Sequence, residues 1–162
     1  MKSKIKQLDF TGETIFIALD VHRKNWRVTV GSKEFELEHY TQSPNVKDLA
    51  RHLKRNYPGA KYMVAYEAGF CGFGIQRSLK EEGIDCIVVN TVDIPTSNKE
   101  KRRKQDKIDS RKIYKRLAAG DLEGIYVPQT EMEHVRSLVR ERSRIVSDQT
   151  RCKNRIWSLL MF

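Results

Sequence analysis

The sequence has few cysteines and no long hydrophobic run. Its three cysteines, Cys71, Cys86 and Cys152, form no C-x-x-C pair, which argues against a zinc site or a dithiol redox motif. An odd number of thiols is typical of proteins in a reducing cytosol. The apolar runs are too short to span a bilayer, and residues 1–13 lack the apolar segment of a secretory signal. These absences predict a cytoplasmic protein with no membrane partner.

Acidic residues are scarce relative to basic ones. The 162 residues include 31 Lys and Arg against 21 Asp and Glu, which gives a formal net charge of +10. Many of these cations lie between Lys99 and Arg116 instead of being spread evenly along the chain. Clustered cations favour a polyanionic partner, because binding releases the counterions of that partner. We therefore expect the protein to bind nucleic acid.

The order of secondary-structure patterns predicts an α/β fold. Continuous or alternating apolar residues indicate five strands, over 14–20, 25–30, 33–40, 61–67 and 84–89. Two helices are expected between the last three strands, and the first of them has Ser43 as its cap and Pro44 at its first position. Three antiparallel strands followed by two crossover-connected strands predict a mixed five-stranded sheet with flanking helices. This is the layout of a ribonuclease H-like domain.

The second half of the chain is expected to be helical. One helix is predicted over 106–119, and a single long helix from Glu131 to Phe162. The long helix has apolar residues at helical spacing and charged residues on its other faces. Because such a stripe requires burial, we expect a partner helix and a homo-oligomer formed through this segment.

Four acidic residues are the candidate site. Asp20 and Glu67 end the first and fourth strands, which are neighbours in the predicted sheet, and ligands bind at this edge of open α/β sheets. Asp106 and Asp109 are three residues apart and share one face of the following helix. Asp106 could instead cap that helix, and Asp109 could pair with a neighbouring cation. His22 follows Asp20 by two residues and is a candidate for contacting phosphate or tuning the site.

Clustered carboxylates surrounded by positive charge suit phosphoryl transfer with divalent metal ions. Two such ions about 3.5–4 Å apart stabilise the attacking and leaving oxygens of a phosphodiester. Mg²⁺, or Mn²⁺, prefers hard oxygen ligands and keeps several waters, so a few carboxylates suffice. The basic residues of this region are the candidates for nucleic-acid contacts, namely Lys99, Lys101, Arg102, Arg103, Lys104, Lys107, Arg111 and Lys112.

Four segments carry a resemblance to a known family. Residues 19–24 (LDVHRK), 66–69 (YEAG), 88–90 (VVN) and 104–110 (KQDKIDS) resemble the DEDD-type insertion-sequence transposases. These are relatives of the Piv-like DNA invertases and are RNA-guided recombinases. The resemblance extends over roughly residues 14–160.

The resemblance implies a RuvC-like catalytic domain over 1–128 that binds magnesium through Asp20, Glu67, Asp106 and Asp109. It implies DNA strand cleavage and exchange in transposition, directed by a structured guide RNA. Residues 129–162 resemble the start of the family's coiled-coil segment. In the family, a C-terminal domain with a nucleophilic serine follows, and we expect that domain to be absent from this chain.

Two alternatives remain open. The chain could be a non-catalytic nucleic-acid-binding fragment of a transposase, in which case the basic residues matter and the acids do not. It could also be a stand-alone RuvC-like junction nuclease. Substitution of the acids separates a catalytic from a binding role.

Overall fold

The structure is a computed structural model that describes residues 9–90 and 110–161. The chain divides into two compact units, residues 1–126 and 127–162.

The first unit contains a five-stranded mixed sheet. Its strands are β1 (Thr14–Val21), β2 (Trp26–Gly31), β3 (Glu36–Gln42), β4 (Lys61–Glu67) and β5 (Asp85–Val89). The spatial order is β3-β2-β1-β4-β5. Strand β2 is antiparallel to both of its neighbours, β1 and β3, whereas β4 is parallel to both β1 and β5. This strand order confirms the predicted ribonuclease H-like fold.

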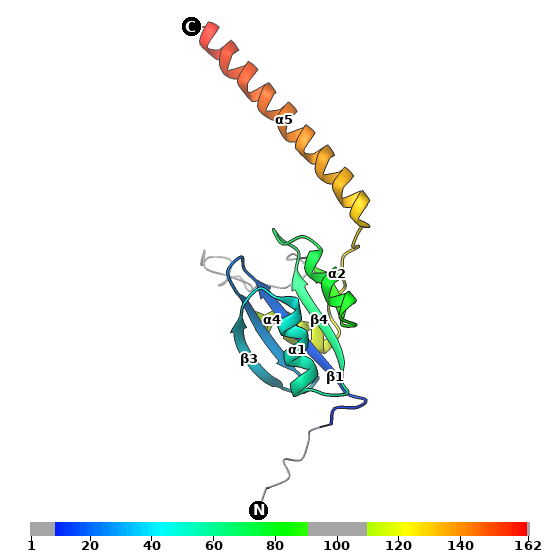
Figure 1. The fold of residues 1–162 in the computed structure, drawn as a ribbon. Helices are drawn as coiled ribbons and strands as arrows, with labels where there is room; N and C mark the ends of the chain where they lie inside the picture. Colours follow the sequence, from blue (N-terminus) through cyan, green and yellow to red (C-terminus); the bar gives the residue numbers. More distant parts are fainter. Residues whose placement is uncertain (1–8, 91–109, 162) are drawn as a thin grey trace, which may run out of the picture. The chain divides into compact units, whose positions relative to one another are not determined.

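Helices cover both faces of this sheet (Figure 1). Helix α4 (Ser110–Ala119) packs Ile113, Tyr114, Leu117 and Ala118 on the face that carries Ala18, Ala65 and Val89. Helix α1 (Val46–Asn56) lies on the other face, and α2 (Gly74–Glu81) packs beside β5. Side chains on the α1 side, such as Ile17, Leu19, Val64 and Tyr66, are completely buried. The near-continuous apolar character of β1 and β4 follows from burial on both faces.

The turn between β2 and β3 requires a glycine. A Cβ atom at Gly31 would collide with the Tyr114 hydroxyl and lie 2.6 Å from the carbonyl oxygen of Phe35. Because Gly31 has no Cβ atom, the Tyr114 hydroxyl can donate to the Ser32 carbonyl oxygen at 2.8 Å. This hydrogen bond connects α4 to the turn. The Ser32 hydroxyl accepts from the backbone N–H groups of Glu34 and Phe35, so β3 begins at Glu36 and not at the predicted residue 33.

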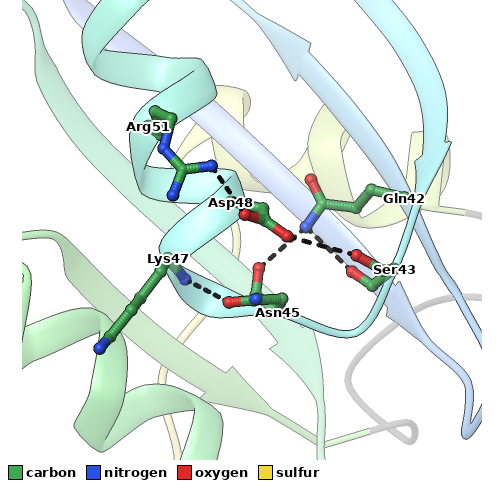
Figure 2. A network of polar contacts seen from close by, with 6 residues as sticks. All are labelled: Gln42, Ser43, Asn45, Lys47, Asp48 and Arg51. Carbon is green, nitrogen blue, oxygen red and sulfur yellow. Dashed lines mark hydrogen bonds and ion pairs between the residues drawn. The ribbon is translucent and has the colours of Figure 1, made fainter.

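The predicted cap of α1 was wrong. Asn45, and not Ser43, caps the helix, because its side-chain oxygen accepts from the Lys47 backbone N–H at 2.9 Å. Figure 2 shows the surrounding network, in which the Ser43 hydroxyl donates to Asp48 at 3.4 Å and Arg51 pairs with the same carboxylate. Pro44 therefore precedes the cap and lies outside the helix.

The chain after α4 runs beside β5. Gly120 has a φ of 79°, the left-handed conformation that ends helices. Ile125 donates its backbone N–H to the Val88 carbonyl oxygen at 2.7 Å, and Gly124 lies against Ile87. An extended segment thus pairs with the outer edge of the last strand.

The second unit is the helix α5 (Thr130–Leu160), which confirms the predicted long helix. None of its residues is buried. Its exposed apolar residues are Met132, Val135, Leu138, Val139, Ile145, Val146, Ile156, Trp157, Leu159 and Leu160. Among the described residues, no helix is long and apolar enough to cross a membrane.

Candidate functional site

Asp20 and Glu67 lie side by side at the carboxyl edge of the sheet. Strands β1 and β4 are parallel, and their pairing runs from Thr14 with Lys61 to Leu19 with Tyr66. Continuing the register by one residue places Asp20 beside Glu67 on adjacent strands. Paired residues of neighbouring strands point to the same side of a sheet, so the two carboxylates share one face.

The two carboxylates extend the face that packs on α4. Ala18 and Ala65, which precede them by two residues on the same face, are buried against this helix. Asp20 has a side chain that is only 12% exposed, and Glu67 is partly buried. Burying an ionised carboxylate removes it from water, which is unfavourable unless another group compensates the charge. This edge of the sheet is therefore suited to binding a cation.

His22 is the partner of Asp20. Its Nε2 atom lies 3.1 Å from Oδ2 of Asp20, and its ring is 34% exposed. The backbone N–H of His22 donates to the Asn25 carbonyl oxygen at 3.0 Å, which closes the turn between β1 and β2. The turn therefore holds the imidazole against the carboxylate.

A buried polar contact fixes the start of α4 beside this edge. The hydroxyls of Ser110 and Thr29 are both fully buried and lie 2.8 Å apart. Thr29 pairs across the sheet with Ala18, two residues before Asp20, and its hydroxyl also lies 3.0 Å from Nδ1 of His39. The first described residue of α4 is therefore anchored one row of side chains below the carboxylates. The sequence analysis missed Thr29, because a threonine in an alternating strand carries no signal of its own.

The two predicted basic residues within α4 are in different environments. Arg111 is exposed and donates from Nε to both carboxylate oxygens of Glu36, at 2.9 and 3.1 Å. Lys112 is partly buried. The other predicted nucleic-acid contacts, Lys99, Lys101, Arg102, Arg103, Lys104 and Lys107, lie outside the described residues, as do Asp106 and Asp109.

The described part of the site is a carboxylate pair and its histidine. Within residues 9–90 and 110–161, no three His, Cys, Asp or Glu side chains are grouped closely enough to hold a metal ion. The donor set at this edge is nevertheless of the right chemistry for Mg²⁺, which is bound through one or two carboxylates together with water and substrate phosphate. The residues present fit such an ion, and further ligands have to come from elsewhere in the chain or from the substrate.

Two aromatic residues near the site have a packing role. Trp26 is 3% exposed and Tyr66 is completely buried, so neither is free to stack on a base. The Tyr66 hydroxyl donates to the Gly72 carbonyl oxygen at 3.0 Å and thereby holds the turn that follows Glu67. Burial raises the pKa of Tyr66 above its usual range, which keeps this hydroxyl a donor.

Comparisons with known proteins agree with the motifs. A family model of the DEDD type, described as a transposase, matches residues 17–162. A candidate transposase of Sinorhizobium fredii, y4rJ, is 34% identical over 163 residues, which cover 90% of this chain and 41% of that protein. The transposase for the insertion sequence element IS1533 of Leptospira borgpetersenii is 29% identical over 154 residues, which cover 91% of this chain and 43% of that protein. The chain thus spans less than half of the length of these relatives.

A solved structure is also similar. It is that of T. thermophilus RuvC in complex with Holliday junction substrate, which is 10% identical, with a TM-score of 0.40 over 72% of this chain and 83% of that one. The fold assignment above rests on the strand order of the sheet.

Proposed function

Because the chain belongs to the DEDD-type IS110 transposase family, we propose that it is the catalytic N-terminal part of a DNA transposase that cleaves and exchanges DNA strands. The observation that carries this proposal is the placement of Asp20 beside Glu67 at the carboxyl ends of adjacent parallel strands. An acid at that position of each strand contributes little to the core and is suited to phosphoryl transfer.

The proposed cofactor is Mg²⁺ or Mn²⁺, held by Asp20, Glu67, Asp106 and Asp109. A bound divalent ion would polarise the phosphodiester and stabilise its developing charge. Asp20 and Glu67 would bind it from one face of the sheet, while His22 holds the Asp20 carboxylate in place. The anchoring of Ser110, the covalent neighbour of Asp109, supports a contribution from this part of the chain.

The activity of the whole transposase extends the proposal further. We propose that a structured guide RNA directs the protein to its DNA, and that the basic residues between Lys99 and Lys112 contact nucleic acid. The net charge of +10 supports a polyanionic partner. A cytoplasmic location belongs to the same proposal, and the free cysteines at positions 71, 86 and 152 support it.

The test of the catalytic site combines metal binding and cleavage. Mg²⁺ or Mn²⁺ is titrated calorimetrically into the 162-residue chain and its Asp20→Asn variant, with Asp85→Asn as the matched control. Asp85 is exposed and begins β5, at the opposite edge from Asp20. We expect metal binding to be lost only in Asp20→Asn. In the full-length protein the same variant should lose at least about 100-fold in cleavage rate, since a bound metal contributes several kcal/mol.

Three outcomes would count against this assignment. Cleavage that survives Asp20→Asn would place the chemistry elsewhere. Absence of metal binding by the wild-type chain, even with DNA present, together with intact nucleic-acid binding, would favour a non-catalytic binding fragment. Cleavage of branched DNA by this chain alone would favour a stand-alone junction nuclease.

We further propose that α5 mediates homo-oligomer formation. The support is its stripe of exposed apolar residues, among them Leu138, which is 72% exposed, and Ile145, which is 61% exposed. Two such helices can bury these stripes against each other as a coiled coil. The wild-type chain should sediment as a dimer or larger at tens of micromolar, and Leu138→Glu/Ile145→Glu should be monomeric. Glu141→Gln/Arg142→Gln is the control, and a monomeric wild type would contradict the proposal.

A further inference from the structure

Arg27 extends the carboxylate pair by one strand. It is the cross-strand partner of Asp20 on β2, and its partner on β3 is Thr41. Directly opposed residues of neighbouring strands point to the same side, with Cβ atoms about 4.5–5.5 Å apart. Thr41, Arg27, Asp20 and Glu67 therefore form one row across four neighbouring strands, in which the cation Arg27 stands next to the two acids.

The position of Arg27 within β2 makes it accessible. Its neighbours in sequence, Trp26 and Val28, are buried on the α1 side of the sheet, and Arg27 is exposed on the other side. The next row toward the core contains Thr29, which is covered by Ser110 at the start of α4. Arg27 thus belongs to the row of Asp20, which lies one row beyond the contact between Thr29 and Ser110.

Two more exposed cations lie beside this row. Arg23 and Lys24 occupy the turn that joins β1 to β2, between His22 and Asn25. Among the described residues, neither of them nor Arg27 takes part in an ion pair. Some other cations of this unit have carboxylate partners, as in Lys54 with Glu82 and Arg116 with Asp121.

The lack of a pair between Arg27 and Asp20 is informative because the two residues are adjacent. The Asp20 carboxylate contacts His22 instead, so the guanidinium is left available for another anion. A planar guanidinium presents several donors in a fork that matches phosphate oxygens. An arginine next to the proposed metal-binding acids would contact the phosphates of the nucleic-acid strand that enters the site.

We propose that Arg27, with Arg23 and Lys24, binds the phosphodiester backbone of the DNA strand on which Asp20 and Glu67 act. This inference rests on the proposed function and names a contact surface of that site. In the sequence, these three residues are distinct from the basic stretch at 99–112. Arg27 contacts the phosphates closest to the carboxylates, and Arg23 and Lys24 extend the contact along the turn.

The test is the salt dependence of DNA binding by the 162-residue chain. A short labelled DNA duplex and an RNA duplex of the same sequence are titrated in EDTA at several salt concentrations. The variants are Arg27→Gln, with Arg55→Gln as control, and Arg23→Gln/Lys24→Gln, with Lys47→Gln/Arg55→Gln as control. Lys47 and Arg55 are exposed on α1, across the sheet from Arg27, and the paired variants remove equal charge.

We expect each surface variant to weaken DNA binding more than its control. Arg27→Gln should raise the Kd about three- to tenfold, because it removes a charge-assisted hydrogen bond. The slope of log K against log salt should fall by about one for each lost phosphate contact. Arg27→Lys should keep most of that slope and still lose affinity, because lysine lacks the fork.

Equal effects in the surface and control variants would overturn the proposal, as would a loss confined to the RNA duplex. Unchanged thermal unfolding of Arg27→Gln excludes a folding defect as the cause of weaker binding. Since EDTA removes metal ions, this result is independent of the metal titration described above. Failure of the metal site with a specific effect of Arg27→Gln contradicts only the catalytic proposal, and the reverse pattern contradicts only this one.

Discussion

Asp20 and Glu67 each follow a side chain that is completely buried, Leu19 and Tyr66 respectively. The sequence reveals this arrangement because an acid at the end of an apolar run is easy to recognise. Arg27 is the direct cross-strand neighbour of Asp20, and Thr29 lies one row away, but both occur in an alternating strand, where polar residues are expected on one face. Their position near Asp20 follows from the strand register, which could not be predicted from the sequence alone.

Thr29 is the residue at which stability and site geometry are most directly linked. Thr29→Val keeps the side-chain volume and removes the hydroxyl that contacts Ser110 and His39. We expect the free energy of unfolding to fall by about 1–2 kcal/mol, since each buried hydrogen bond contributes about 1 kcal/mol. Urea unfolding measures this change.

The control for this variant is Thr41→Val, the same substitution at an exposed position of β3. It should alter stability by no more than about 0.5 kcal/mol. Equal losses in the two variants would show that the contact with Ser110 adds nothing to the stability of the fold.

At the scale of the elements, the start of α1 shows why caps are difficult to predict. The sequence predicted Ser43 as the cap, because Pro44 follows it and proline is favoured at the first helical position. In the structure, Asn45 has an extended backbone and satisfies the Lys47 N–H, while Ser43 reaches Asp48 (Figure 2). The choice depends on how the chain leaves β3, where Gln42 donates to the carbonyl oxygens of Ser43 and Asn45.

This assignment predicts an asymmetry between two alanine substitutions. Asn45→Ala should lower the free energy of unfolding by about 0.5–2 kcal/mol, because an orphan N–H of the first turn loses its acceptor. Ser43→Ala should change it by less than about 0.5 kcal/mol, since its contact is exposed and long. Thermal or urea unfolding measures the stability of both variants. A larger loss of stability in Ser43→Ala than in Asn45→Ala would show that Ser43 is the cap.

The strands and the long helix were predictable because hydrophobic period alone defines them. All five strands and α5 lie within a few residues of their expected positions. The beginning of β3 could not be predicted in this way, because it is set by the turn at Ser32, which depends on side-chain hydrogen bonds. The register agrees with the expected placement of Asp20 beside Glu67 on adjacent strands. Their role as metal ligands stays a prediction, as does that of Asp106 and Asp109, which lie outside the described residues.

At the scale of the whole molecule, buried tyrosines set an upper limit to the pH range of stability. Burial raises the pKa values of Tyr40, Tyr57 and Tyr66, and a hydrogen bond with Glu38 adds to the effect at Tyr57. The folded protein therefore keeps protons that the unfolded chain releases above its ordinary tyrosine pKa of about 10. Stability should be fully present below that pH and be lost as the pH rises toward the folded-state values.

Urea unfolding between pH 8 and pH 11 tests this prediction. The free energy of unfolding should fall as the pH rises above about 10, and Tyr66→Phe should make the fall shallower. This variant should also lose about 1 kcal/mol at pH 8, because the contact with Gly72 is removed. Tyr126→Phe, at an exposed tyrosine, should retain the full steepness of the wild type. An identical pH dependence in all three proteins would contradict the role given to burial.

The row that contains Asp20 and Glu67 lies beyond the last buried residues of β1 and β4, and this has an evolutionary consequence. Substitutions that remove the two acids leave the core intact and relieve the repulsion between neighbouring carboxylates. A gene copy that mutates there yields a protein that still folds and keeps the cations of the adjoining turn. Such a copy would occupy the same DNA as its active relatives without cutting it. On the proposed function, a copy that loses both acids would therefore act as an inhibitor of the surviving active copies.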